Sequence, residues 1–129
     1  MSNIENYHGI IVNLSQKNKS IFKRLNIVGV RKVLFGIIKI YKIDTSEKEI
    51  NELIQEIQMN MSKSILMINQ EFYAHFYRKN ELIIIYRNKI FSVTMDKKTW
   101  EEAIKYGRSI GIKEKQLDFI PNRIEDENF

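Results

Sequence analysis

The chain contains no cysteine, one proline and five glycines among its 129 residues. The absence of cysteine excludes disulfides, thiolate metal sites and cysteine nucleophiles. The glycines, at positions 9, 29, 36, 107 and 111, match neither of the glycine-rich patterns that bind phosphates. The longest apolar runs, VLFGII and LIIIY, are too short to cross a bilayer, and the N-terminus lacks a signal-peptide pattern. We therefore expect a cytoplasmic protein with no membrane association.

The length is that of one domain able to bury a core, so we expect a single domain over residues 1–129 with a loose acidic tail at 124–129. Motifs for catalysis are also missing. His8 and His75 have no acid or histidine at metal-ligand spacing, and no serine-nucleophile signature occurs. The sequence predicts no metal site and no cofactor. Whether the protein is an enzyme stays open, with a preference for no, because active sites assemble in space.

Acidic residues are nearly absent from the first third of the chain. Up to Ile43 there are eight Lys or Arg and one acid, Glu5, so 8 − 1 = +7, whereas the remainder carries 13 − 15 = −2. This asymmetry predicts a positive surface that attracts phosphate or an acidic partner. The alternative is that the acidic tail RIEDENF folds back and neutralises it. The predicted anion-binding residues are Lys17, Lys19, Lys23, Arg24, Arg31 and Lys32.

Hydrophobic periodicity predicts the order of elements. We expect strands at 9–14 and 36–43, a short amphipathic helix at 17–25, and an ambiguous strand or loop at 26–34. The segment TSEKEINELIQEIQMNM predicts a helix with Ser46 and Glu49 as a capping box, and a last helix begins at Thr99 with Glu102 as its partner and Gly111 as terminator. The short return LDFIP would place Leu117 and Phe119 on the core.

The stretch EFYAHFYRKNELIIIYRNKIFSVTMD predicts three antiparallel strands joined by two-residue turns. The first turn places His75 opposite Ile84 and Tyr73 opposite Tyr86, and the second places Tyr86 opposite Phe91. Because side chains alternate, one sheet face would carry Tyr73, His75, Tyr77 and Tyr86, and the other Phe72, Phe76, Ile83, Ile85 and Ile90. The second face is too apolar for a solvated surface. A helix, or a second copy of the chain packed by face or edge to form a homodimer, should cover it.

These elements predict an α+β fold, in which an antiparallel or mixed sheet of about five strands carries two main helices on one face. A ferredoxin-like variant is the preferred topology. The segments YAHFY, LIIIYRNKIFSV and TWEEAIKYGRSIGIKEKQLDF resemble a group of small uncharacterised bacterial cytoplasmic proteins. The resemblance covers the C-terminal half and implies no activity.

Three functions stay open. The first is a non-enzymatic binding or regulatory protein whose basic N-terminal third engages nucleic acid, a nucleotide or an acidic protein surface. The second is a small enzyme or ligand-binding domain with a pocket around Tyr73, His75, Tyr77 and Tyr86, in which His75 is the candidate base. Against this, the predicted apolar neighbours Leu82, Ile84 and Val93 favour a neutral core residue whose ring is bonded to a tyrosine or a carbonyl. The third is a self-associating interaction domain without a ligand.

Overall fold

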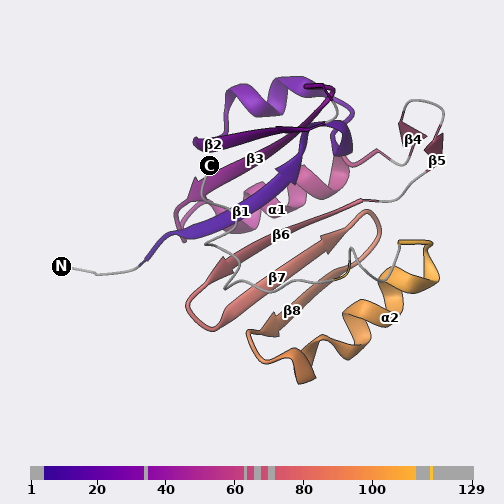
Figure 1. Cartoon of the computed structure of the whole chain (residues 1–129). Coiled ribbons are helices and arrows are strands. Elements are labelled where there is room, and N and C mark those ends of the chain that lie inside the picture. Colours follow the sequence, from indigo (N-terminus) through magenta and orange to yellow (C-terminus); the bar gives the residue numbers. More distant parts are fainter. Residues whose placement is uncertain are drawn as a thin grey trace.

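The centre of the protein is a six-stranded antiparallel sheet with strand order β2-β3-β1-β6-β7-β8 (Figure 1). The computed structural model describes residues 5–33, 35–62, 64–65, 68–69, 72–112 and 117. The strands of the sheet are β1 (Tyr7–Val12), β2 (Ile27–Val33), β3 (Ile38–Thr45), β6 (Tyr73–Arg78), β7 (Glu81–Tyr86) and β8 (Ile90–Thr94). A separate small hairpin consists of β4 (Ser64–Ile65) and β5 (Ile68–Asn69). The helices are α1 (Ile50–Met59) and α2 (Glu101–Ser109), and the 3-10 helices are η1 (Asn13–Ser15), η2 (Lys19–Lys23) and η3 (Lys97–Trp100).

The α+β class is confirmed, but the predicted strand count of about five is wrong. The ambiguous segment at 26–34 supplies the sixth strand, β2, which pairs with β3 along its length. The predicted short helix at 17–25 is the 3-10 helix η2, in which the Asn18 side chain accepts a hydrogen bond from the Ser20 amide. The ferredoxin-like topology is not confirmed.

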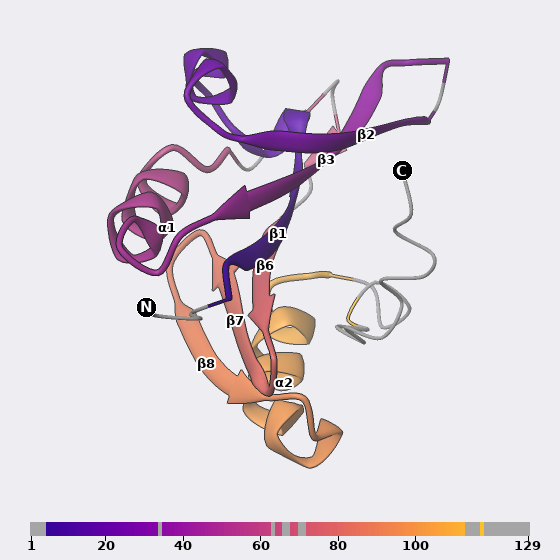
Figure 2. The same ribbon diagram turned by 90° about the vertical axis from the view of Figure 1, so that its left-hand side faces the viewer.

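The two helices cover opposite faces of the sheet, so the prediction that both pack on one face is wrong (Figure 2). Ile50, Ile54 and Ile57 of α1 pack with Phe76 and Ile85 in one core cluster. On the other face, Ala103 and Ile104 of α2 pack with Leu82, Ile84 and Tyr86. Alternation along β6 and β7 gives the sheet two apolar faces, and each face needs its own cover.

The three-strand meander forms with the predicted first register. His75 pairs with Ile84 and Tyr73 with Tyr86, across the turn Lys79–Asn80 in which Lys79 has a φ of 51°. The second register is shifted by two residues, since Phe91 pairs with Ile84 and not with Tyr86. The shift places the turn at Arg87–Asn88. Because a shift of two keeps every side chain on its face, the predicted face assignments hold.

Both predicted capping boxes are wrong, because each helix begins later than expected. At α1, Ser46 binds the amides of Glu49 and Ile50 through its backbone carbonyl. Before α2, the Asp96 side chain caps the Lys98 amide at η3, while the Thr99 hydroxyl binds the Thr94 amide. Gly111, at φ 95°, follows α2 as predicted, and Leu117 is buried on its side of the sheet. Phe119 and the tail at 124–129 lie outside the described residues.

The apolar face predicted to need cover receives it within the chain. Phe76 and Ile85 are fully buried beneath α1, while Ile90 at the sheet edge is 38% exposed. A dimer packed face to face through these strands is therefore unnecessary. Within the part of the chain that the structure describes, no helix is long and apolar enough to cross a membrane.

Candidate functional site

The most unusual charge arrangement lies on the hairpin formed by β2 and β3. Lys32 and Lys39 are direct cross-strand partners in this hairpin. Side chains at such positions start about 5 Å apart, and like charges there destabilise the sheet. Among the described residues neither lysine forms an ion pair with a carboxylate. Lys32 is exposed and Lys39 is half-buried, so the arrangement offers two positive charges without a carboxylate partner to an external anion.

An aromatic pair lies next to the two lysines. Tyr41 follows Lys39 on the same face of β3, and its ring lies 4.7 Å from that of Phe22 in η2, centroid to centroid. Both rings are half-buried. The Asn13 side chain fixes η1 to this hairpin, since its Oδ1 accepts from the Lys39 amide at 3.0 Å and its Nδ2 donates to the Ile37 carbonyl at 3.2 Å. These two hydrogen bonds anchor the strand that carries Lys39 to η1.

Two of the predicted anion-binding residues are already engaged within the chain. The Lys19 ammonium donates to the carbonyls of Asn13 and Gln16, at 2.6 Å each, and partial burial lowers its pKa. Arg24 forms an ion pair with Glu56 of α1. Both residues tie the turns η1 and η2 to their surroundings. Lys17 and Lys23 are exposed on these turns.

The remaining two predicted residues, Arg31 and Lys32, are neighbours in β2 and therefore point to opposite faces of the sheet. Lys32 shares its face with Lys39 and Tyr41, whereas Arg31 pairs with Ile40 on the face that α2 covers further along the sheet. The structure thus does not unite the six predicted residues in one cluster. We define the hairpin surface as Lys32, Lys39, Tyr41 and Phe22.

A row of rings crosses the opposite face, where the pocket was predicted. The His75 ring lies 6.1 Å from that of Tyr73 and 6.2 Å from that of Tyr77, and the His8 ring lies 5.6 Å from Tyr77. Burial lowers the pKa of His75 from 6.5 to about 4. The imidazole is therefore neutral at pH 7, as the core interpretation of this residue requires.

Tyr86 belongs to the core beneath α2. Its hydroxyl donates to the Ala103 carbonyl at 2.7 Å, and burial raises its pKa far above 10. Its ring packs against those of Phe91 and Tyr106, at centroid distances of 5.9 and 5.0 Å. These contacts hold the phenol in a structural role at this end of the row.

His8 is more closely surrounded than its position in the sequence suggests. Strand β1 places it between Tyr77 of β6 and Asp44 of β3. Its Nδ1 lies 3.6 Å from Asp44 Oδ1, and neither of these two buried atoms has a hydrogen-bond partner among the described residues. The separation is too long for a hydrogen bond. This pair brings a carboxylate to the row of rings, but His8 and Asp44 do not form a hydrogen-bonded dyad.

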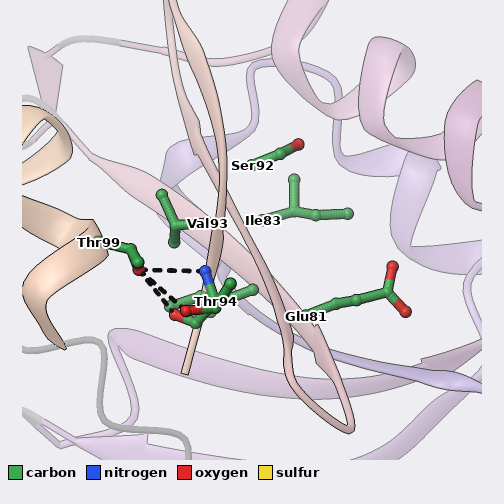
Figure 3. Close-up of a pocket in the computed structure, with 7 residues that line it drawn as sticks. Glu81, Ile83, Ser92, Val93, Thr94 and Thr99 are labelled. Atoms are coloured by element: carbon green, nitrogen blue, oxygen red, sulfur yellow. Dashed lines mark hydrogen bonds between the residues drawn. The ribbon is translucent and has the colours of Figure 1, made fainter. Parts of the chain in front are cut away.

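A shallow depression of about 330 Å³ lies beside β8 (Figure 3). Its lining comes from β7, β8 and η3: Glu81, Leu82, Ile83, Ser92, Val93, Thr94 and Thr99. The Thr99 hydroxyl, at one side, accepts from the Thr94 amide at 3.1 Å. The opposite carboxylate, Glu81, is held by Arg78 at 2.7 Å and by the Tyr7 hydroxyl at 2.9 Å. The depression therefore offers no charged group that lacks a partner.

No group of three or more histidine or acidic side chains among the described residues is arranged to hold a metal ion.

The residue of the hairpin surface that the sequence prediction left out of the anion site is Lys39. It was counted among the basic residues of the first third, but its position depends on the pairing of β2 with β3. Since the sequence left residues 26–34 as either strand or loop, it did not predict that Lys32 pairs with Lys39. The signal that could have revealed it is the pair of lysines on either side of the glycine-containing connection between 33 and 38.

No known protein family, curated protein or solved structure matches this chain. The resemblance of the C-terminal half to a group of small bacterial proteins stays a prediction.

Proposed function

We propose that this protein is a non-enzymatic binding protein that engages nucleic acid through the hairpin surface. The observation that carries the proposal is the direct opposition of Lys32 and Lys39 with no carboxylate partner among the described residues. Such a pair costs folding stability, and a phosphate placed between the two ammonium groups would remove that cost. Regions that lower stability in this way commonly serve binding.

The neighbouring rings favour a nucleic acid over a small anion. Tyr41 and Phe22 lie beside the lysines and present half-buried aromatic surface against which a base or sugar can pack. The exposed Lys17 and Lys23 on the adjoining turns extend the positive surface along which a polyanion would run. An acidic protein surface would use the lysines but not the rings.

The test is binding of a fluorescent oligonucleotide, single-stranded and duplex, at about 50 and about 200 mM salt. The double variant Lys32→Glu and Lys39→Glu should weaken binding by more than tenfold and make the salt dependence shallower. The matched control is Lys97→Glu and Lys98→Glu, which changes net charge equally on exposed residues of η3.

Equal weakening by the two double variants would show that binding follows net charge, with no site on the hairpin. Competition by nucleoside triphosphate or by polyglutamate identifies the other anions considered. If polyglutamate competes as well as an oligonucleotide of equal charge, the partner is an acidic protein surface and the proposal is wrong.

The pocket hypothesis for Tyr73, His75, Tyr77 and Tyr86 stays a prediction. The described structure gives these rings packing contacts and a neutral imidazole, both of which a core role explains.

A further inference from the structure

The two edges of the sheet differ in how they are protected against pairing with another strand. Edge strand β2 contains a register irregularity between Ile27 and Gly29 and carries Arg31 and Lys32. Bulges and charges are the devices that keep edges apart. Edge strand β8, with sequence IFSVT, has no charge, no proline and a continuous register with β7. Its contrast with β2 indicates that β8 has a partner.

The hydrogen-bond phase of β8 shows which of its groups face outward. Lys89 exchanges backbone hydrogen bonds with Tyr86, and the Met95 amide donates to the Asn80 carbonyl. In an antiparallel ladder the residues in between alternate, so Phe91 and Val93 bond to β7 while Ile90, Ser92 and Thr94 point their backbone groups away from it.

The outward groups of Thr94 are already satisfied by η3. Its amide donates to the Thr99 hydroxyl at 3.1 Å, and its carbonyl accepts from the Trp100 indole at 2.7 Å. Ile90 and Ser92 have no such partner among the described residues, and both are exposed. The available edge is therefore one short stretch, Ile90-Phe91-Ser92, closed at one end by η3.

We propose that this stretch pairs with the same stretch of a second copy of the chain, forming a symmetric dimer with one continuous sheet. A two-fold axis at Phe91 places Ile90 opposite Ser92 of the partner subunit and the reverse. This register uses every outward amide and carbonyl of the two residues in both copies. The next outward residue, Thr94, already bonds to η3 through its amide and carbonyl. The intermolecular ladder therefore consists of the two symmetry-related pairs of Ile90 with Ser92.

Side chains support the same register. Phe91 is half-buried and already contacts the rings of Tyr86 and Tyr106, so a second phenylalanine on the axis would extend an existing aromatic cluster. Antiparallel pairing also brings the turn that ends in Lys89 toward the end that holds Glu81 and Asp96 in the other copy. That end also carries the exposed Lys97 and Lys98 of η3, so the charges that meet Lys89 there are of both signs.

The dimer is independent of the proposed nucleic-acid binding. The axis lies at the edge opposite the hairpin (Figure 1), so the two hairpin surfaces would stand at the far ends of the joined sheet. Two separated sites on one dimer would raise the apparent affinity for a long polyanion. A monomeric variant should still bind a short oligonucleotide in a salt-dependent way.

The first experiment is sedimentation velocity of the full chain at about 100 µM, where a weak interface is populated. We expect a mass of twice 15.4 kDa for the wild type. Ser92→Pro removes one outward donor and no bond to β7, so it should give a folded monomer. Ser92→Ala keeps the amide and should remain dimeric. A wild type that is monomeric, or a dimer that survives Ser92→Pro, would overturn the proposal.

The second experiment tests the register and does not depend on the proline variant folding. Because the chain has no cysteine, a single engineered cysteine can form only an intermolecular disulfide. Residues facing each other at a non-hydrogen-bonded position have Cα atoms about 4.5 Å apart, within the disulfide range. Phe91→Cys should therefore cross-link rapidly under mild oxidation, whereas Ser92→Cys, two residues out of register with itself, should not. Equal cross-linking of both variants would reject the axis at Phe91.

Discussion

Replacing Lys32 by glutamate should stabilise the protein while weakening its binding. The substitution turns a like-charge cross-strand pair with Lys39 into an opposite-charge pair. Most substitutions lower stability, and the few that raise it at the expense of function mark a site selected for binding. The pair on the hairpin therefore provides a direct test of whether its arrangement serves an external anion.

The magnitude follows from Coulomb's law. If the two side-chain charges lie about 7 Å apart in water, the unscreened energy is about 0.6 kcal/mol. Screening reduces this energy to about 0.25 kcal/mol at about 0.15 M salt and about 0.5 kcal/mol at about 0.01 M. Reversing one charge changes the sign of the interaction, so Lys32→Glu should gain about 0.5 kcal/mol at the higher salt and about 1 kcal/mol at the lower.

The assay is urea unfolding of four proteins: the wild type, the two single variants and the double variant Lys32→Glu with Lys39→Glu. The double variant restores a like-charge pair, so its stability should return toward that of the wild type. The coupling energy counts four such interactions and should be about 2 kcal/mol at about 0.01 M salt and about 1 kcal/mol at about 0.15 M.

Lys97→Glu is the control, since it makes the same charge change beside Asp96 and Glu101 and should gain nothing. A coupling energy near zero, or one that does not respond to salt, would refute the reasoning. Such a result would mean that the two ammonium groups turn away from each other and that the opposition of Lys32 and Lys39 has no energetic consequence.

Three further predictions concern the core. The pKa of His75 is about 4 in the folded protein and 6.5 in the unfolded chain, so the unfolded chain binds a proton first as pH falls. The contribution of His75 to the free energy of unfolding should be fully present above pH 6.5. It should decrease by about 3 kcal/mol between pH 6.5 and 4. His75→Gln should remove that part of the pH dependence in urea titrations at several pH values, and an unchanged profile would contradict a neutral, half-buried ring in the folded protein. Gly9→Ala should cost about 1–3 kcal/mol, because a Cβ at residue 9 would lie 2.3 Å from the Phe76 ring; a neutral result in thermal unfolding would show that the ring moves freely. Tyr86→Phe should cost about 1 kcal/mol through loss of the hydrogen bond to the Ala103 carbonyl, and a much larger loss would show that packing of α2 depends on the hydroxyl.

Local patterns predicted the meander because strand periodicity and turn residues lie within 26 consecutive residues. Alternation alone assigned Tyr77 and Phe76 to different faces, and the face assignments of the meander survived a shift of two residues in the second register. A register shift of one residue would have reversed those of β8. The period of the strand is thus a more robust signal than the position of the turn.

The cover of the sheet could not be predicted in the same way. An amphipathic helix such as α1 shows an apolar stripe, but the stripe does not say which of two apolar sheet faces it meets. That choice depends on the path of the chain from Thr45 of β3 into α1 and from Thr94 of β8 into α2. The same limitation hid the hairpin surface. Lys39 lies opposite Lys32 only because β2 is a strand, and GVRK gave a mixed signal of strand and loop.

The charges on β2 have two consequences that act together. Arg31 and Lys32 keep this edge of the sheet from pairing with another strand, and Lys32 with Lys39 makes the same hairpin attractive to a polyanion. Strand β8 has neither property, since its sequence carries no charge and its outward groups at Ile90 and Ser92 lack partners in the described chain. The net charge of +5 makes random self-association unfavourable, so contact between copies is favoured where the surface is locally uncharged. The uneven distribution of charge along one sheet can therefore direct phosphate to one edge and a second copy of the chain to the other.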